Sequence, residues 1–191
     1  MAITTLNNRS INRSDTASAD QVWTATSATA SDFQAAGGIT VADQWRVTAN
    51  ITANADPISS NLERIDTTGQ GTIGTAMSES SGIFTFPSTG IYLVSYNAFC
   101  SSVAGGDNVG MELKVTTDNS SYATISYNYD GNDSFNTNSI SGNSLIDVTD
   151  TSNVKVSFSA VSITAGSYFY GDTTGTTSNE TYFTFIRLGD T

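Results

Sequence analysis

The sequence has few of the residues on which enzymes and nucleic-acid-binding proteins depend. Its 191 residues include no histidine, one cysteine and two prolines, and seven lysines and arginines stand against 18 aspartates and glutamates. Without histidine the chain lacks the commonest general base and the commonest transition-metal ligand. A net charge of −11 leaves too few basic residues for the cationic stripe that nucleic acids require. The composition therefore predicts a protein that is not an enzyme and binds no nucleic acid.

Disulfides, membrane spans and leader peptides also lack their sequence signals. Cys100 is the only cysteine, so no intrachain disulfide can form, and its apolar neighbours predict a packed structural thiol. No run approaches the roughly 18 apolar residues of a membrane helix, and the opening MAITTLNNRSINRS has no apolar stretch. We expect a soluble chain without a secretory signal or membrane insertion.

No familiar catalytic or cofactor motif is present. The chain has no phosphate-binding or dinucleotide glycine pattern, and its carboxylates are dispersed. Residues 130–134 (DGNDS) begin like a calcium loop, but Phe135 stands where the glycine is needed and Ser141 where the closing glutamate is needed. An exposed hairpin loop is the favoured interpretation, and we expect no metal and no cofactor.

The composition changes near residue 44. Residues 14–41 are mostly alanine, serine and threonine, too poor in large apolar side chains to form a core. We therefore expect a low-complexity docking arm over residues 1–44 and a head domain over residues 45–191. Within the arm, Ser31 as a cap and the glycines at 37 and 38 as a stop predict a short helical turn. The candidate docking residues of the arm are Arg9, Arg13, Trp23 and Phe33, although a solvated tail would have the same composition.

Strand signals recur from Trp45 onward, separated by clusters of Gly, Asn, Asp and Ser. The predicted strands cover residues 45–51, 58–66, 83–86, 90–99, 109–116, 123–129, 140–148, 154–163 and 182–188. Residues 109–116 and 154–163 alternate apolar with polar side chains, which predicts one solvent-facing side for each.

The run GIFTFPSTGIYLVSYNAF at residues 82–99 contains two aromatic strands around a turn. Its second strand is apolar on both faces, with Tyr92 and Tyr96 on one side and Ile91, Leu93 and Phe99 on the other. Such a strand either lies deep in a sandwich or is covered by a neighbouring subunit.

This run resembles the core of the globular head of complement component 1q, within the tumour necrosis factor-like jelly rolls. The later segments ISGNSLIDVTDTSNVKVSFSA and YFTFIRL are similar to that family's hydrophobic strands and closing aromatic strand. The resemblance implies an all-β, antiparallel jelly-roll β-sandwich that assembles as a homotrimer. The aromatic residues expected in the core or at the three-fold axis are Phe84, Phe86, Tyr92, Tyr96, Phe158, Phe183 and Phe185.

The first 34 residues resemble a second group of proteins. The opening MAITTLNNRSINRSDTASADQVWTATSATASDFQ is similar to the openings of virion structural proteins of tailed marine phages, especially those infecting cyanobacteria. This resemblance implies a trimeric capsid decoration or tail fibre and attachment protein. It would be assembled in the host cytoplasm, anchored to capsid or tail proteins by the arm and exposed on the virion surface.

Three aromatic residues, Tyr168, Phe169 and Tyr170, stand beside a Gly/Thr/Asp-rich run. They either pack at the trimer axis or form a rim that contacts a sugar or a protein, such as a host surface glycan or receptor. The alternative function is accordingly a free-standing carbohydrate-binding or adhesion module. A hydrolase with paired carboxylates is the weakest of the three function classes.

Overall fold

The computed structural model describes residues 21–25, 31–35, 38–102, 107–132, 136–164, 166–172 and 178–191. The chain forms two compact units, residues 1–38 and residues 39–191. This division lies ahead of the expected boundary at residue 44, because strand β3 (Ala42–Val47) already pairs within a sheet of the larger unit.

The smaller unit contains a β-hairpin. Strands β1 (Gln21–Ala25) and β2 (Ser31–Ala35) pair antiparallel, with Trp23 opposite Phe33. The predicted helical turn that begins at Ser31 is therefore wrong. Pairing with β1 gives the backbone groups of this segment partners that a single helical turn would leave unsatisfied.

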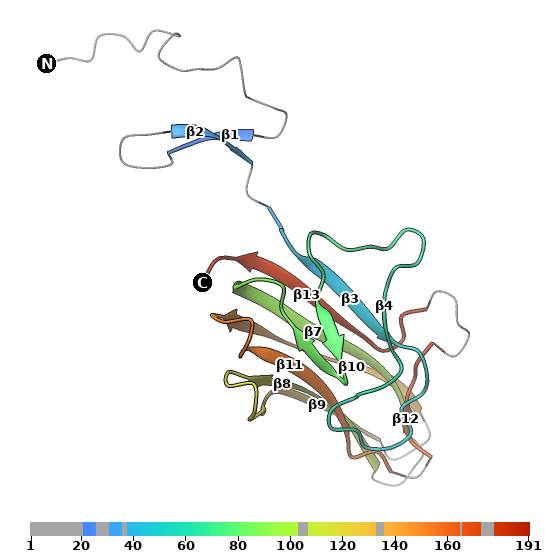
Figure 1. The fold of residues 1–191 in the computed structure, drawn as a ribbon. Helices are drawn as coiled ribbons and strands as arrows, with labels where there is room; N and C mark the ends of the chain where they lie inside the picture. Colours follow the sequence, from blue (N-terminus) through green and yellow to red (C-terminus); the bar gives the residue numbers. More distant parts are fainter. Residues whose placement is uncertain are drawn as a thin grey trace, which may run out of the picture. The chain divides into compact units, whose positions relative to one another are not determined.

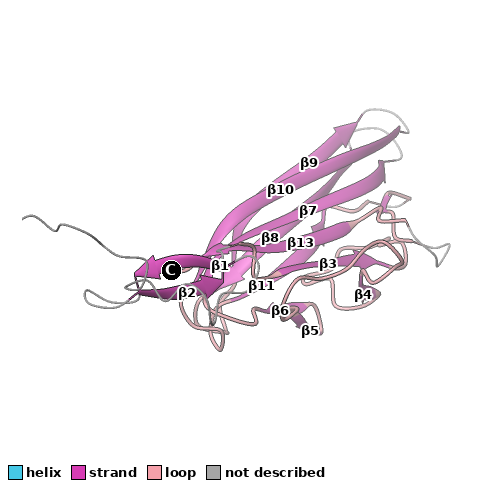
Figure 2. Cartoon of the chain, turned by 90° about the horizontal axis from the view of Figure 1, so that it is seen from above, coloured by secondary structure: helices cyan, strands magenta, loops and turns pink. Residues whose placement is uncertain are grey.

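Two antiparallel sheets make up the larger unit (Figure 1). The first has the order β10-β7-β13-β3-β4, with β12 paired to the end of β7, and the second has the order β5-β6-β11-β8-β9. The remaining strands are β4 (Leu62–Arg64), β5 (Ser78–Ser80), β6 (Ile83–Thr85), β7 (Gly90–Ser102), β8 (Asp107–Thr116), β9 (Ala123–Asn132), β10 (Asn136–Val148), β11 (Lys155–Val161), β12 (Tyr168–Phe169) and β13 (Tyr182–Gly189). Figure 2 shows strands and loops but no helix among the described residues. The predicted all-β antiparallel jelly roll is confirmed.

Strand β7 is an inner strand of the first sheet, and its side chains alternate between the interior and the outer face over most of its length. The even-numbered residues from Tyr92 to Cys100 are buried against the second sheet. This period of two is the pattern that predicted the strand. The strand continues three residues beyond the expected end at Phe99, and all three are buried.

The first two strands predicted for the head are shorter than expected for one physical reason. β3 ends at Val47 and β4 is short, whereas strands were expected over residues 45–51 and 58–66. Residues 55–58 instead run along β11, where the Ile58 amide donates a hydrogen bond to the Phe158 carbonyl oxygen at 2.8 Å. The segment leaves the first sheet because the second sheet offers it backbone partners. Strand β5 was not predicted.

The predicted solvent-facing side of β11 is also wrong. Ser157 and Ser159 are both buried, although they alternate with the core residues of this strand. The Ser159 hydroxyl donates to the Asp56 Oδ1 atom at 2.7 Å. Because β11 is central in its sheet and the segment around Asp56 covers it, small hydroxyl side chains fit where long polar ones would not.

Candidate functional site

The aromatic residues predicted for the core or a three-fold axis lie inside the sandwich. All seven are buried: Phe84, Phe86, Tyr92, Tyr96, Phe158, Phe183 and Phe185. The Phe158 and Phe183 rings stack with centroids 3.8 Å apart, and Phe84 packs edge-on against Phe158 at 5.7 Å. These rings join the two sheets and leave external contacts to other side chains.

The polar ends of the buried tyrosines are satisfied within the chain. The Tyr96 hydroxyl donates to the Met111 carbonyl oxygen at 2.9 Å and accepts a hydrogen bond from Asn128 at 3.0 Å. Burial raises the pKa of Tyr96, so the phenol stays neutral. The Tyr92 hydroxyl donates to the Ser88 carbonyl oxygen at 3.1 Å. Both tyrosines therefore serve packing rather than ligand binding.

The outer side of the first sheet carries a surface of mostly uncharged side chains, which we call the uncharged face. The strand register arranges its members in three neighbouring rows across β10, β7, β13 and β3. The first row is apolar and the next two are polar: Leu145, Leu93, Ile186 and Ala42; Asn143, Ser95, Thr184 and Gln44; Ser141, Asn97, Tyr182 and Arg46. Arg46 is charged, but its side chain is 6% exposed and its Nη2 atom lies 2.7 Å from the Glu63 Oε2 atom.

The apolar row of this face remains accessible to solvent. The Leu145 residue is 62% exposed, and Leu93 and Ile186 are half-buried. Sequence reasoning found the outward apolar side of β7 through Ile91, Leu93 and Phe99 but did not single out Leu145 or Ile186. Two adjacent apolar residues in a strand could have indicated them, because adjacent residues point to opposite faces of the sheet. In β10, for example, Ile146 is buried and its neighbour Leu145 therefore points outward.

The predicted rim aromatics separate into one buried residue and two accessible ones. Phe169 belongs to the core with 0% exposure, so it cannot contact a ligand. Tyr170 stacks on Phe99 with centroids 4.5 Å apart, and Tyr168 packs against Tyr170 at 4.7 Å. The neighbouring Tyr168 hydroxyl, followed by burial, raises the pKa of Tyr170. Of the three predicted rim aromatics, Tyr168 and Tyr170 are partly accessible to solvent.

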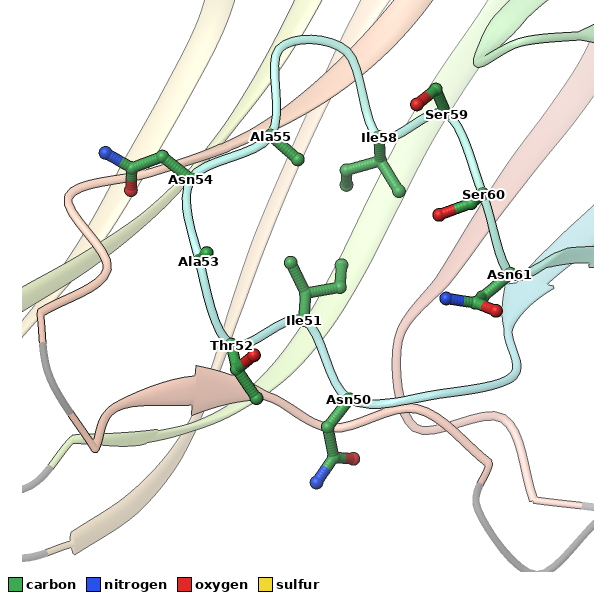
Figure 3. Close-up of a pocket in the computed structure, with 10 residues that line it drawn as sticks. All are labelled: Asn50, Ile51, Thr52, Ala53, Asn54, Ala55, Ile58, Ser59, Ser60 and Asn61. Carbon is green, nitrogen blue, oxygen red and sulfur yellow. The ribbon is translucent and has the colours of Figure 1, made fainter.

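A cavity of about 240 Å³ lies in the loop of residues 50–61 (Figure 3). Ile51 and Ile58 point toward each other across the loop, whereas Asn50 and Asn54 point away from its centre. The two asparagines accept hydrogen bonds from the Gly171 and Ile163 amides, at 3.1 and 2.8 Å. The lining contains no charged or titratable side chain, so this cavity has no group suited to acid, base or metal chemistry.

The structure describes two of the four predicted arm residues and part of the calcium-like run. Arg9 and Arg13 lie outside the described residues, and Trp23 and Phe33 occupy opposite positions of the β1–β2 hairpin. In the part of the chain that the structure describes, no three Cys, Asp or Glu side chains gather to hold a metal ion. Of the calcium-like run, Asp130 accepts a hydrogen bond from Asn138 at 3.0 Å, and residues 133–135 are outside the described ranges. Over the described residues, no helix is long and apolar enough to cross a membrane.

No protein-family model and no curated protein matches the sequence. Solved structures do match the fold. Mouse APRIL at pH 5.0 is 12% identical, with a TM-score of 0.57, over 78% of this chain and 98% of that one. The Eiger TNF of S. frugiperda is 13% identical, with a TM-score of 0.59, over 81% of this chain and 96% of that one. The globular domain of zebrafish complement 1qA is 16% identical, with a TM-score of 0.51, over 79% of this chain and 99% of that one. The fold is a jelly roll of the tumour necrosis factor and complement 1q type.

Proposed function

We propose that the protein is a non-enzymatic structural protein of a tailed bacteriophage particle, in which three heads associate through their uncharged faces. The arm anchors the assembly to capsid or tail proteins, and the head acts as a decoration or an attachment fibre. The observation that carries this proposal is the uncharged face itself.

The charge distribution supports self-association through this face. Chains of net charge −11 repel one another, so copies associate most readily where no like charges meet. The uncharged face offers three rows of side chains, one of them apolar, on the broad side of a sheet, and the charged member of these rows, Arg46, is buried and paired with Glu63. Burying Leu145 and its row against a second copy would remove apolar area from water at about 25 cal/mol per Å². The likeness of the fold to complement 1q and tumour necrosis factor domains agrees with this arrangement.

The expected low stability of the isolated arm supports an anchoring role. A single two-stranded hairpin is at best marginally stable in water, so β1 and β2 would gain stability by packing on a partner. The likeness of the opening residues to phage virion proteins is the reason that we propose capsid or tail proteins as the partner. The arm would then dock to the particle, and the head would be exposed on its surface.

Light scattering on the full chain tests the assembly. The expected mass is about three times the chain mass of 20.0 kDa. The Leu145→Asp variant adds a charge to the exposed apolar row and should run as a monomer, since the like charges would meet in the assembly. Ile125→Asp is the matched control, because Ile125 is an exposed aliphatic residue on the other sheet; it should remain trimeric.

A monomeric wild type at micromolar concentration would refute the assembly, and so would a trimeric Leu145→Asp variant. Thermal melting of both variants separates dissociation from unfolding. The particle context has its own test: mass spectrometry and electron cryomicroscopy of intact particles from the source should find this chain as three-fold density. Its absence from purified particles would exclude the virion role and leave the trimer question untouched.

A further inference from the structure

A second exposed surface lies on the opposite side of the head, along the edge strand β9. Ile125, Tyr127 and Tyr129 occupy alternate positions of this strand and are 39, 37 and 45% exposed. The residues between them turn the other way, as Asn128 does when it donates to the buried Tyr96 hydroxyl. The three side chains therefore form an apolar and aromatic stripe on the outer face of the second sheet.

A glycine lets the tyrosine rings lie close to this sheet. Gly110 is the register partner of Tyr129, and a Cβ atom on it would meet the Tyr129 ring at 2.7 Å. The ring thus lies over the β8 backbone at a place that any larger residue would block. The Tyr127 ring stands at 83° to that of Tyr129, with centroids 3.8 Å apart. Two perpendicular rings offer a ligand one flat face and one edge.

Hydrogen-bonding groups border the stripe. Glu112 is the register partner of Tyr127, and its Oε2 atom accepts from the Thr124 hydroxyl at 3.1 Å. The Lys114 ammonium group lies 2.6 Å from the Asp56 Oδ2 atom and 3.3 Å from the Glu112 Oε2 atom. The hydrogen bond from Lys114 holds the pKa of Asp56 below its usual value, so this carboxylate is an acceptor at neutral pH. Asp56, Glu112 and Lys114 together carry one net negative charge, and Lys114 already forms ion pairs with both carboxylates.

This chemistry favours a neutral, hydroxyl-rich ligand. Aromatic rings provide flat apolar area with little entropy to lose, and exposed carboxylate oxygens accept hydrogen bonds from hydroxyl groups. An anionic ligand would meet the net charge of −11 and no free cation within the cluster. Stable protein interfaces engage about 20 to 30 residues on each side, far more than this stripe exposes. A saccharide has the size and the mixture of C–H faces and hydroxyl donors that the stripe fits.

We propose that Tyr127 and Tyr129 form a binding site for a neutral saccharide chain, whose hydroxyl groups donate to Asp56 and Glu112. The site belongs to the second sheet, so it does not depend on association through the uncharged face or on a phage context. A trimer built through the first sheet would leave three such stripes free.

Affinity electrophoresis of the full chain tests the site, with dextran, mannan and galactan as neutral probes and alginate as the anionic probe. We expect at least one neutral polysaccharide to retard the wild type. Tyr127→Ala and Tyr129→Ala should each weaken the apparent affinity about tenfold or more, the loss of about 1.4 kcal/mol that one stacking contact supplies. Tyr127→Phe should retain most of the retardation, because it keeps the ring. Tyr168→Ala is the matched control at the rim and should behave like the wild type.

Several results would overturn the proposal: no retardation by any neutral probe, unchanged retardation of the double alanine variant, an equal loss in Tyr168→Ala, or stronger retardation by alginate. Light scattering on the alanine variants shows whether a loss of saccharide binding is accompanied by a loss of the trimer. A lower mass for Tyr127→Ala would assign the stripe to contact between copies and reject the saccharide site.

Discussion

Replacing Phe158 by alanine should remove a large part of the stability of the head. The ring of Phe158 is 1% exposed at the centre of β11. It stacks on Phe183 and also packs edge-on against Phe84, Tyr96 and Phe185, at centroid distances of 5.7, 6.3 and 6.1 Å. One side chain thus connects strands of both sheets, and its loss leaves a cavity that none of its rigid aromatic neighbours can fill.

The magnitude follows from burial and ring contacts. Truncating a buried phenylalanine to alanine costs about 3 to 5 kcal/mol. Each well-placed aromatic pair adds about 0.5 to 1.5 kcal/mol beyond the buried area. With four ring partners, Phe158→Ala should fall at the upper end, about 5 kcal/mol, against a total of about 5 to 15 kcal/mol for a typical protein. Phe158→Leu, which keeps most of the volume, should cost less than half as much.

Urea denaturation followed by fluorescence measures this loss. Every variant should be compared at one protein concentration, because association makes apparent stability depend on concentration. Tyr168→Ala is the comparison, since Tyr168 is half-buried at the end of the head, and its expected cost is about 1 kcal/mol or less. If Phe158→Ala is near neutral while Tyr168→Ala unfolds the protein, the division between core and rim is wrong.

The Cys100 thiol should resist iodoacetamide in the native protein at pH 8 and react fully in urea, because burial, and then the nearby Asp130 carboxylate, raise the pKa of the thiol to about 12; fast native alkylation would contradict this. Asp43→Ala should destabilise the head by about 3 to 5 kcal/mol in the same urea assay, because the buried carboxylate pairs with Arg64 and accepts hydrogen bonds from Trp45 Nε1 and the Met77 amide. A cost below about 1 kcal/mol would show that water replaces it. Deleting residues 1–38 should leave the head with one cooperative melting transition, because residues 39–191 form a compact unit. The same deletion should abolish binding to particles, because it removes the proposed anchor. Particle binding by the truncated chain would show that the arm is not the anchor.

Local patterns in the sequence predicted the fold well, because the jelly roll is built from strands with alternating burial. The aromatic run that includes Phe84, Tyr92 and Tyr96 identified the core, since a period of two places these residues on one side. The pairing partners were harder to predict. Residues 55–58 join β11 across about a hundred residues of sequence, and no local signal distinguishes that partner from the first sheet.

The candidate surfaces were predicted less completely than the core. Residues 123–129 (ATISYNY) predicted a strand, but alternation alone does not say which side faces solvent. Asn128 points to the buried Tyr96, so Tyr127 and Tyr129 lie on the exposed outer side of the sheet. For Phe169 the ambiguity had the opposite outcome. It stands between two tyrosines, and its pairing with Cys100 places it inward, in the core.

The strand register gives the head two unlike ends. Ala42, where the chain enters β3, is paired with Ile186 close to the point where the chain leaves β13, and both lie level with Leu93 near the beginning of β7. The rim tyrosines and the loop cavity lie at the other end, where Tyr168 is paired with Ser101. The length of β7 between Leu93 and Ser101 is about 26 Å at about 3.3 Å per residue. Three heads assembled side by side with strands aligned, as we propose, would thus have a base, where the chain enters β3, and a tip. A tag fused after Thr191 would stand at the base, whereas the tip would remain unobstructed.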